Sequence, residues 1–414
     1  MKILHLCDSL NPAGLGGYES IIHYLSDTMA ELGHKSFVVT QSPYRHSPES
    51  IEHPHYTIYY LKGNLLEARK WEFYTLSEEE RVEAAGELFK PSDIAENVDI
   101  IAGQLTALIE RLQPDIIHAH STYIVFNKVI MKLRLSAQLR TPAIVTIHGL
   151  PKPITLPDGR DSTDYNEFSL DSDFDLVLAV SENVAEELRK HLKSSDYDKV
   201  RVVYSGIDLS SFRPLPNVEK QWDLAFMGRL ETMKAVDLFP EMLSILKPRF
   251  PRLKMMITGE GSLKSWLFSE FEKRNVSSMI DYKGVVETDR VPLLLNKSRI
   301  FLYPSRREPF GLSIIEAMAC GIPVITTNVF GPGEIVRPDY DGIVVPPDDV
   351  NALADAVVLL LSDRELREKI AQNAIMTAQE YDIRQYARQL LEIYQDLIEK
   401  RKKTIMWGSE EPHN

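Results

Sequence analysis

Hydrophobic and polar positions along the chain form two alternating kinds of segment. Short apolar runs, of a length suited to buried strands, occur at residues 2–8, 36–40, 56–61, 115–119, 143–147, 175–180, 200–203, 223–227, 253–258 and 300–303. Longer segments with apolar residues at helical spacing separate many of these runs, including residues 18–32, 94–112 and 383–403. Strands that alternate with helices predict an α/β protein with doubly wound parallel sheets, whose ligands bind at the carboxyl ends of the strands.

The clearest domain boundary follows the apolar run at 200–203. Pro214, Pro216 and a polar stretch up to Gln221 interrupt the alternation there, as linkers do. We therefore predict a first domain at 1–213, a second at 214–382 and a terminal helix at 383–414. The acidic segment 64–90 is interpreted as an insertion over the cleft, and 341–346 as a hairpin-like element.

Composition restricts the classes of function. The chain has 414 residues and a net charge of −13, which argues against a general nucleic-acid binder. Cys7 and Cys320 are its only cysteines, so we expect buried thiols in a reducing compartment. No apolar run approaches the roughly 20 residues of a membrane-spanning helix. Asp8 arrives too early for a signal peptide, and the sequence predicts a cytoplasmic protein.

Residues 300–327 carry the most informative chemistry. They predict a strand, a polar loop, a helix and a second strand, with Glu308 in the loop and Glu316 in the helix. Free N–H groups at a helix start near Gly311 can receive phosphate oxygens, and a carboxylate can accept hydrogen bonds from vicinal hydroxyls. The pattern indicates a phosphorylated, polyhydroxylated ligand. The alternative is a pair of solvated glutamates beside an ordinary turn.

Two further segments suit a phosphate ligand. A glycine-rich loop at 11–17 precedes the helix at 18–32, which makes either a phosphate cradle or a plain tight turn. Arg229 and Lys234 follow a predicted strand in the second domain. Two cations there can neutralise a diphosphate, although surface basic residues are a common alternative.

Histidines end two predicted strands of the first domain. His120 and His148 lie where ligands bind in such sheets, although a lone histidine at a strand end is more often structural. His118, His120 and His148 raise the question of a metal, but no carboxylate or cysteine completes a ligand spacing. We predict no metal site.

Residues 308–325, EPFGLSIIEAMACGIPVI, closely resemble the signature of the retaining glycosyltransferases of family 4, which carry two glutamates separated by seven residues. The resemblance extends to a GG-x-E element at 16–19, to GRL and a lysine at 228–234, and to the TIHG and YKGVV segments. Ser205 and Ala235 depart from the usual pattern. The resemblance implies a GT-B fold, two Rossmann-like domains facing a cleft, with the helix at 383–414 crossing back onto the first domain.

The resemblance also implies roles for individual residues. Arg229 and Lys234 would hold the diphosphate, Glu308 the transferred sugar and Glu316 the ribose. The predicted catalytic residues are Arg229, Lys234, Glu308 and His148. The predicted donor-binding residues are Gly16, Gly17, Phe310, Gly311, Leu312, Glu316 and Val286.

The function implied is retaining transfer of a sugar from a nucleotide-diphosphate sugar to an acceptor hydroxyl, without a cofactor. A UDP-sugar is favoured over a GDP-sugar. The sequence does not identify the acceptor, which is a saccharide, a lipid-linked molecule or a small molecule. A non-catalytic GT-B protein that binds sugar nucleotides, or a GT-B epimerase or phosphorylase, is the alternative. The basic segment at 127–140 suits either an anionic membrane or packing on the sheet, and we favour packing.

Overall fold

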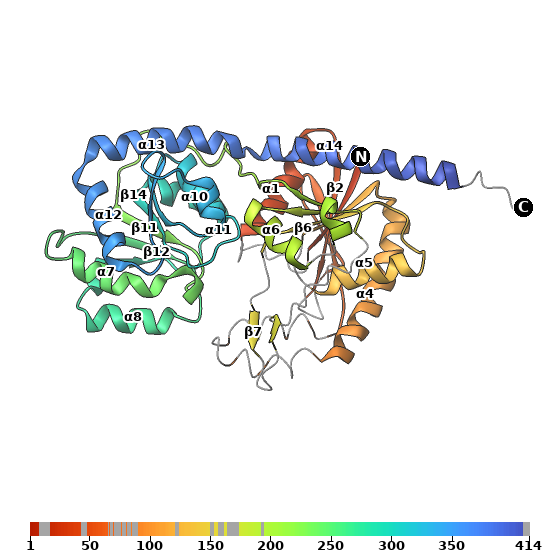
Figure 1. The fold of residues 1–414 in the computed structure, drawn as a ribbon, viewed down its shortest axis with the longest axis horizontal. Coiled ribbons are helices and arrows are strands. Elements are labelled where there is room, and N and C mark those ends of the chain that lie inside the picture. Colours follow the sequence, from red (N-terminus) through yellow and green to blue (C-terminus); the bar gives the residue numbers. More distant parts are fainter. Residues whose placement is uncertain are drawn as a thin grey trace, which may run out of the picture.

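Two parallel sheets, each layered between helices, make up the molecule (Figure 1). The computed structural model describes residues 1–7, 17–42, 48–64, 66, 69, 76, 80, 84, 90–120, 124–149, 153–155, 161–163, 174–191 and 194–408. Most of the predicted insertion at 64–90 and the glycine-rich loop up to residue 16 therefore lie outside the described residues.

The first sheet has eight strands, of which only β3 at one edge runs antiparallel to its neighbour. Their order across the sheet is β10 (Val200–Val202), β9 (Leu176–Ala179), β6 (Ala143–Ile147), β5 (Ile116–His120), β1 (Lys2–Cys7), β2 (Lys35–Gln41), β4 (Tyr56–Leu61) and β3 (Ser50–Glu52). Strand β1 pairs in parallel with both β2 and β5. The carboxyl ends of the central strands therefore lie along one edge.

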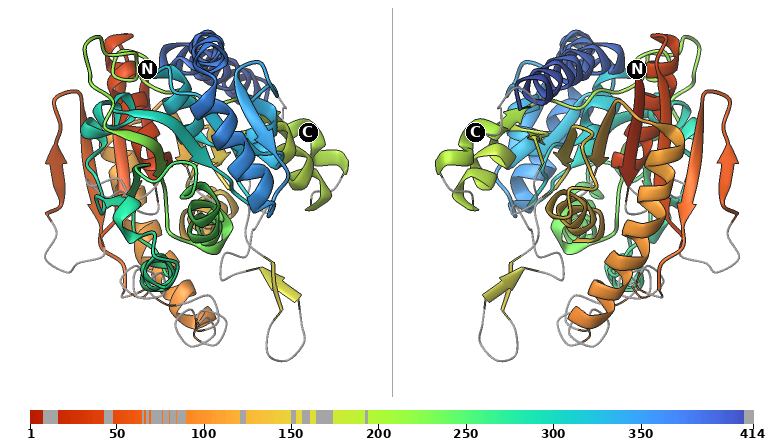
Figure 2. Two further views of the ribbon diagram at one scale, coloured as in Figure 1. Left: turned by 90° about the vertical axis from the view of Figure 1, so that its left-hand side faces the viewer. Right: turned by 90° about the vertical axis from the view of Figure 1, so that its right-hand side faces the viewer.

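Helices cover both faces of this sheet. One face packs against α4 (Pro91–Leu112), α5 (Ile124–Leu135) and α6 (Glu182–His191), with Leu4 and Leu6 pointing that way from β1. The other face packs against α1 (Gly17–Glu31) and α14 (Ile383–Gly408), and Ile3 points that way. Neighbouring residues of a strand face opposite sides, so each strand contributes to two apolar layers. The small hairpin of β7 (Pro153–Thr155) and β8 (Asp161–Thr163) projects from the body (Figure 2).

The second sheet has six strands, all parallel. Their order is β13 (Ile280–Tyr282), β12 (Met255–Thr258), β11 (Trp222–Met227), β14 (Ser298–Tyr303), β15 (Val324–Thr327) and β16 (Gly342–Val345). The helices around it are α7 (Phe239–Leu246), α8 (Lys264–Lys273), α9 (Val291–Asn296), α10 (Leu312–Ala319), α11 (Phe330–Ile335), α12 (Val350–Ser362) and α13 (Arg364–Ala378).

Local sequence signals explain where several helices begin and end. The carboxylates of Asp349 and Asp363 accept hydrogen bonds from the first turns of α12 and α13, as N-cap residues do. Gly33 and Gly321 follow α1 and α10 with positive φ values of 82° and 70°, the left-handed conformation that ends helices.

The chain passes between the two sheets twice, and the two passages lie side by side. The linker after β10 meets the start of α14 through hydrogen bonds from the Ile207 amide to the Tyr381 carbonyl and from the Ile383 amide to the Ile207 carbonyl. A Cβ on Gly206 would lie 2.7 Å from the Cα of Ile383, so only glycine permits this approach. Beyond this point α13 covers the second domain and α14 the first (Figure 1).

The predicted fold class, two Rossmann-like domains with parallel sheets, is confirmed. One prediction of an element type is wrong. Residues 341–346 were expected to form a hairpin-like element, but β16 pairs in parallel with β15 as the sixth strand. A short Gly-Ile-Val-Val run flanked by turn residues looks the same in both cases, and only the topology of the sheet decides between them. Cys7 and Cys320 are buried thiols.

Candidate active site

The segments that follow two neighbouring strands of the second sheet bring a lysine and a glutamate together. Strands β11 and β14 pair in parallel, so the chain leaves both at the same edge. The short 3₁₀ helix η2 (Thr232–Lys234) after β11 ends in Lys234, whose ammonium forms an ion pair with the carboxylate of Glu308, in the loop after β14. The two residues lie 74 positions apart, so the topology of the sheet creates the pair.

Tyr303 completes this group from the last position of β14. Its hydroxyl donates a hydrogen bond to Oε2 of Glu308 at 2.6 Å and accepts one from Nζ of Lys234 at 2.8 Å. All three residues are buried. We call Lys234, Tyr303 and Glu308 the ion-pair cluster. The sequence analysis missed Tyr303, although a hydroxyl at the carboxyl end of an apolar strand is a signal that was present.

The contacts of the ion-pair cluster determine which of its members are charged. Burial alone would raise the pKa of Glu308, but Lys234, the Tyr303 hydroxyl and the Phe310 amide hold it below the ordinary value. Burial lowers the pKa of Lys234, and Glu308 opposes that shift. Burial and the adjacent carboxylate raise the pKa of Tyr303 well above its usual range. Glu308 is therefore an ionised acceptor that holds the Tyr303 hydroxyl as a donor.

Arg306 fixes the loop that carries Glu308. Its guanidinium makes a bidentate ion pair with Asp237 at 2.7 Å, donates to Asp348 at 2.6 Å and donates to the Thr232 carbonyl at 2.6 Å. Its amide also donates to the Met233 carbonyl at 2.9 Å. Bidentate pairs of this kind hold geometry as well as charge. Arg306 therefore ties the Glu308 loop to the segment that ends in Lys234, a positioning role that the sequence analysis missed.

Arg229 lies beside the ion-pair cluster but, unlike its three buried members, is exposed to solvent. It follows β11 and is exposed, with its guanidinium 3.6 Å from the Met233 sulfur. Its positive charge lowers the pKa of Lys234 and opposes the rise in the pKa of Tyr303. The structure thus separates the two predicted diphosphate cations. Lys234 is buried and paired, and Arg229 is at the surface.

The start of α10 lies directly after the Glu308 loop. Gly311 adopts a φ of 111°, which a side chain would strain, and it precedes the first residue of the helix, Leu312. Glu316, one turn along, is half-buried, and burial raises its pKa to about 7. The ring of Phe310 is buried and stacks on Tyr204 with centroids 5.8 Å apart. Phe310 thus contributes its amide to Glu308, while its ring packs between the domains.

The other residues predicted to bind the sugar donor, so far as the structure describes them, lie on separate elements. Gly17 begins α1, and Gly16 lies outside the described residues. Val286 is half-buried in the loop after β13, and the preceding Gly284 accepts a hydrogen bond from the Gly259 amide at 2.8 Å. A Cβ on Gly259 would lie 2.0 Å from the Gly228 carbonyl oxygen, so the loops after β11 and β12 touch through bare backbone.

The first domain touches the Glu308 loop directly. The Ser181 hydroxyl donates to the Pro309 carbonyl at 2.8 Å, and a Cβ on Gly149 would lie 3.6 Å from the Pro309 ring. The carboxylate of Glu334, from α11, accepts hydrogen bonds at 2.9 Å from the amides of Glu182 and Asn183, at the start of α6. A carboxylate there satisfies amides that the helix leaves unpaired. The second domain therefore caps a helix of the first.

His148 is half-buried and precedes Gly149, so it lies near the Glu308 loop. Its Nε2 is 3.4 Å from Nδ1 of His120. His118, His120 and His148, the histidines that raised the question of a metal in the sequence, are not the three whose ligating atoms lie closest together. Ligating atoms of His5, His118 and His120 lie within 4.8 Å of one another. The sequence analysis missed His5, which lies in the middle of an apolar strand.

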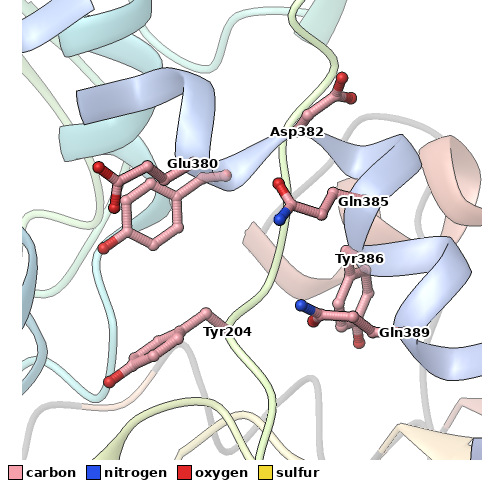
Figure 3. A pocket seen from close by; sticks show the side chains of 7 residues that line it. Tyr204, Glu380, Asp382, Gln385, Tyr386 and Gln389 are labelled. Atoms are coloured by element: carbon pink, nitrogen blue, oxygen red, sulfur yellow. The ribbon is translucent and has the colours of Figure 1, made fainter. Parts of the chain in front are cut away.

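A cavity of about 130 Å³ lies where the chain passes between the domains, lined in part by Tyr204, on which Phe310 stacks. Figure 3 shows its lining from the linker and the start of α14, including Tyr204, Tyr386 and Gln389. It is small for a nucleotide sugar, since ligand pockets span about 300–1,000 Å³. We therefore base the site on the ion-pair cluster and not on this cavity.

The basic helix α5 packs on the sheet, as we favoured. Its apolar residues Phe126, Val129 and Ile130 are buried in the core of the first domain. Lys132 pairs with Asp99, and Arg134 donates to Asp175 at 2.6 Å. Among the helices that the structure describes, none combines the length and apolar character needed to cross a membrane.

Comparison with known families agrees with this geometry. The model "Glycosyltransferase Family 4" matches residues 15–211, and the model "Glycosyl transferases group 1" matches residues 209–377. The chain is a group 1/family 4-like GT-B glycosyltransferase. The two matched ranges meet at residues 209–211.

Individual relatives support the same assignment. The glycosyltransferase is 26% identical over 398 residues to the glycogen synthase of Mycobacterium tuberculosis H37Rv, covering 90% of this chain and 89% of that protein. Its fold resembles that of sucrose-phosphate synthase from Thermosynechococcus elongatus, with a TM-score of 0.78, 21% identity, and 97% and 100% of the two chains covered. It also resembles Anabaena Alr3699/HepE in complex with UDP and glucose, with a TM-score of 0.69, 18% identity, and 96% and 100% covered.

Proposed function

We propose that this glycosyltransferase moves a sugar from a nucleotide-diphosphate sugar to an acceptor hydroxyl, with retention of configuration at the anomeric carbon. The observation that carries the proposal is the ion-pair cluster. It places a carboxylate beside the start of α10, with the exposed Arg229 next to it. This arrangement offers acceptors for sugar hydroxyls and donors for phosphate oxygens within one site.

Electrostatic stabilisation of the leaving group is the main task in such a reaction. Negative charge develops on the β-phosphate as the bond to the sugar breaks, and positioned cations lower the barrier. Glu308 balances the charge of Lys234 through their ion pair. Arg229 and the N–H groups at the start of α10 therefore supply the net positive potential, while Lys234 adds a directed donor. We propose that no bound metal is required.

The two glutamates take different parts in the proposal. Glu308 is held ionised by Lys234 and Tyr303, so it accepts hydrogen bonds from hydroxyls of the transferred sugar. Glu316 lies one turn into α10 and accepts from the ribose. His148, from the opposite domain, reaches the sugar.

UDP is the nucleotide that we propose. Alr3699/HepE, which shares the fold, is described in complexes with UDP and glucose and with UDP-glucose. These complexes support a UDP-sugar donor and a saccharide acceptor for the present chain. The loops of the first domain would select that acceptor, because loops at the ends of strands carry specificity in such folds.

A donor screen followed by product analysis tests the proposal. UDP-, GDP- and ADP-sugars are compared for thermal stabilisation of the protein, and the best donor is incubated with a panel of saccharides. We expect a UDP-sugar to raise the melting temperature most and the product to keep the donor's anomeric configuration by NMR. An inverted product would refute retention, and stabilisation without transfer to any acceptor would favour a binding protein.

Variants of the two glutamates test their separate roles. Glu316→Gln should weaken binding of the bare nucleoside diphosphate as well as the donor in calorimetry. Glu308→Gln should weaken only the nucleotide sugar, because the bare diphosphate lacks the sugar hydroxyls. The opposite pattern would exchange the two roles.

A further inference from the structure

Four histidines lie in the middle of β1, in the middle and at the end of β5, and directly after β6, on the face of the first sheet that α14 covers. His5 and His118 pair in register on β1 and β5, His120 ends β5, and His148 follows β6. His5, His118 and His120 are fully buried, and His148 is half-buried. We call these four residues the histidine cluster.

Three of the four imidazoles form a chain of hydrogen bonds. Nδ1 of His5 lies 3.0 Å from Nε2 of His120, and Nδ1 of His120 lies 3.4 Å from Nε2 of His148. His118 stands outside this chain, because its two ring nitrogens contact the hydroxyls of Thr146 at 2.7 Å and Tyr394 at 2.5 Å. The chain therefore runs from the interior of the sheet toward the domain interface.

Each imidazole in the chain is neutral. Burial lowers the pKa of His5 and of His148 to about 3. Burial also lowers the pKa of His120 well below its ordinary value, and the neighbouring histidines add to this shift. A neutral imidazole carries one N–H and one acceptor nitrogen, so the position of one proton fixes the next along the chain.

The inner end of the chain sets its direction. Nε2 of His5 is buried and has no hydrogen-bond partner among the residues that the structure describes. A buried N–H without an acceptor is rarer and less favourable than a bare lone pair. The proton of His5 therefore lies on Nδ1 and is donated to Nε2 of His120. The proton of His120 must then lie on Nδ1 and be donated to Nε2 of His148.

We propose that His5 and His120 are positioning residues that hold the proton of His148 on Nδ1. All three imidazoles of the chain are then Nδ1–H tautomers. Free histidine prefers the other tautomer, so the interior of the sheet imposes this one. The Nδ1–H of His148 then points out of the hydrogen-bonded series and is donated outside the histidine cluster.

This inference rests on the proposed function for its catalytic consequence. His148 adjoins Gly149, which lies against the loop of Glu308. A fixed Nδ1–H makes His148 a hydrogen-bond donor to an oxygen of the sugar or of the phosphate, and never an acceptor. Glu308 is an ionised acceptor on the opposite domain. The two domains would thus offer the ligand complementary groups, one that only donates and one that only accepts.

A bound metal is the competing interpretation of the histidine cluster. Ligating nitrogens of His5, His118 and His120 lie within 4.8 Å of one another, but no carboxylate of the described residues joins them. A divalent cation there would be buried without a compensating anion, at a high desolvation cost. It would also displace the hydrogen bonds that Thr146 and Tyr394 make with His118. The hydrogen-bonded chain satisfies the same nitrogens without these costs.

Nitrogen and carbon NMR of the full-length protein, with labelled histidine, tests the proposal directly. The chemical shifts of ring nitrogens and of Cδ2 distinguish the two neutral tautomers, and signals are assigned by loss in single variants. We expect His5, His120 and His148 to be Nδ1–H tautomers in the wild-type protein at neutral pH. An Nε2–H tautomer at His148 would overturn the proposal, and this measurement depends on neither a variant nor activity.

Two substitutions at the central link sharpen the test. His120→Leu removes the donor to His148, so His148 should revert to a mixture rich in the Nε2–H tautomer. His120→Asn places an amide N–H close to where Nδ1 was, so it should keep His148 in the Nδ1–H form. Tyr394→Phe is the matched control, because it removes a hydrogen bond to His118 without touching the chain. It should leave the His148 tautomer unchanged.

Kinetics and metal titration complete the experiment. His120→Leu should lower kcat about tenfold, the worth of one hydrogen bond, with a smaller change in KM, and His120→Asn should recover most of it. An unchanged tautomer in His120→Leu would show a merely structural role. Stoichiometric Zn²⁺ binding to the wild type that His120→Asn abolishes would favour the metal instead. If no nucleotide sugar is turned over, the proposed function fails, while the tautomers still decide this inference.

Discussion

The ion-pair cluster and the histidine cluster occupy comparable places in the two domains and differ in how they tolerate burial. The ion-pair cluster follows the carboxyl ends of β11 and β14, and the histidine cluster runs from the middle of β1 and β5 to the carboxyl ends of β5 and β6. The ion-pair cluster keeps charges and compensates them through contact between Lys234 and Glu308. The histidine cluster avoids charge, because burial keeps its imidazoles neutral.

This difference relates topology to chemistry. The same sheet edge can hold an ionic group or a neutral hydrogen-bonded chain, and the side chains decide which. In the proposed function, a diphosphate leaving group requires positive charge, which Lys234 and Arg229 of the second domain would supply. A hydroxyl or a sugar oxygen requires directed hydrogen bonds, which the neutral chain can supply. If this division is correct, breaking the ion pair should be far more costly than breaking a bond in the neutral cluster.

Loss of Lys234 should produce the largest effect. Lys234→Ala leaves the buried Glu308 without its cation, so the unfolding free energy should fall by about 3–5 kcal/mol. Turnover should fall by about 10²–10³-fold, the usual effect of losing a positioned electrostatic group. Urea unfolding and steady-state kinetics measure the two effects. A stable Lys234→Ala protein would show that the pair contributes little to the fold.

Two further variants separate stability from catalysis. Arg229 is exposed, so Arg229→Ala should change the unfolding free energy by less than about 0.5 kcal/mol while lowering turnover by about 10²-fold. The double variant Lys234→Met/Glu308→Gln removes both charges and should regain stability but not activity, because paired buried charges are often replaceable by neutral groups. Full activity in Arg229→Ala would remove that residue from the mechanism.

The sequence predicted residues in the loops of the candidate site but not those inside its strands. Glu308, Gly311 and Lys234 were predicted because they lie in loops or helix starts with recognisable spacing, and the structure places all three at one sheet edge. Tyr303 and His5 were missed because each lies in an apolar run that reads as core. Their partners come from other strands or elements, such as Tyr394, which lies 276 positions from His118. Only the order of strands reveals such pairings.

Glu316 should make the stability depend on pH. Its pKa of about 7, against an ordinary 4.5, means that the folded protein holds a proton that the unfolded chain releases between these values. Its contribution to stability is complete below pH 4.5 and is lost as the pH rises to about 7. We expect a loss of about 1–3 kcal/mol over this range, reduced because Glu316 is only half-buried.

Urea midpoints at several pH values between 4.5 and 8 measure this dependence. Glu316→Gln should flatten it, because the amide does not titrate. Glu260→Gln is the control, since Glu260 pairs with Lys264, which lowers the pKa of its carboxyl. That variant should keep the wild-type slope from pH 5 to 7. Identical slopes in the wild type and in Glu316→Gln would show that Glu316 is ionised in the folded protein throughout.

Matched tyrosine variants give the smallest effect and the closest test of the comparison. Tyr303 and Tyr394 are 4% and 0% exposed, and each loses one hydroxyl on substitution by phenylalanine. The Tyr303 hydroxyl forms a hydrogen bond with the ionised Glu308, and the Tyr394 hydroxyl forms one with the neutral His118. Hydrogen bonds to charged groups contribute about 1.5–3 kcal/mol and those between neutral groups about 0.5–1.5 kcal/mol.

Tyr303→Phe should therefore lower the unfolding free energy by about 2 kcal/mol and Tyr394→Phe by about 1 kcal/mol. The Tyr303 hydroxyl also accepts a hydrogen bond from the Lys234 ammonium, so the difference compares the two charged partners of Tyr303 with the neutral partner of Tyr394. Equal losses in urea unfolding would mean that Glu308 is neutral or that His118 is charged, and the contrast between the two clusters would then fail.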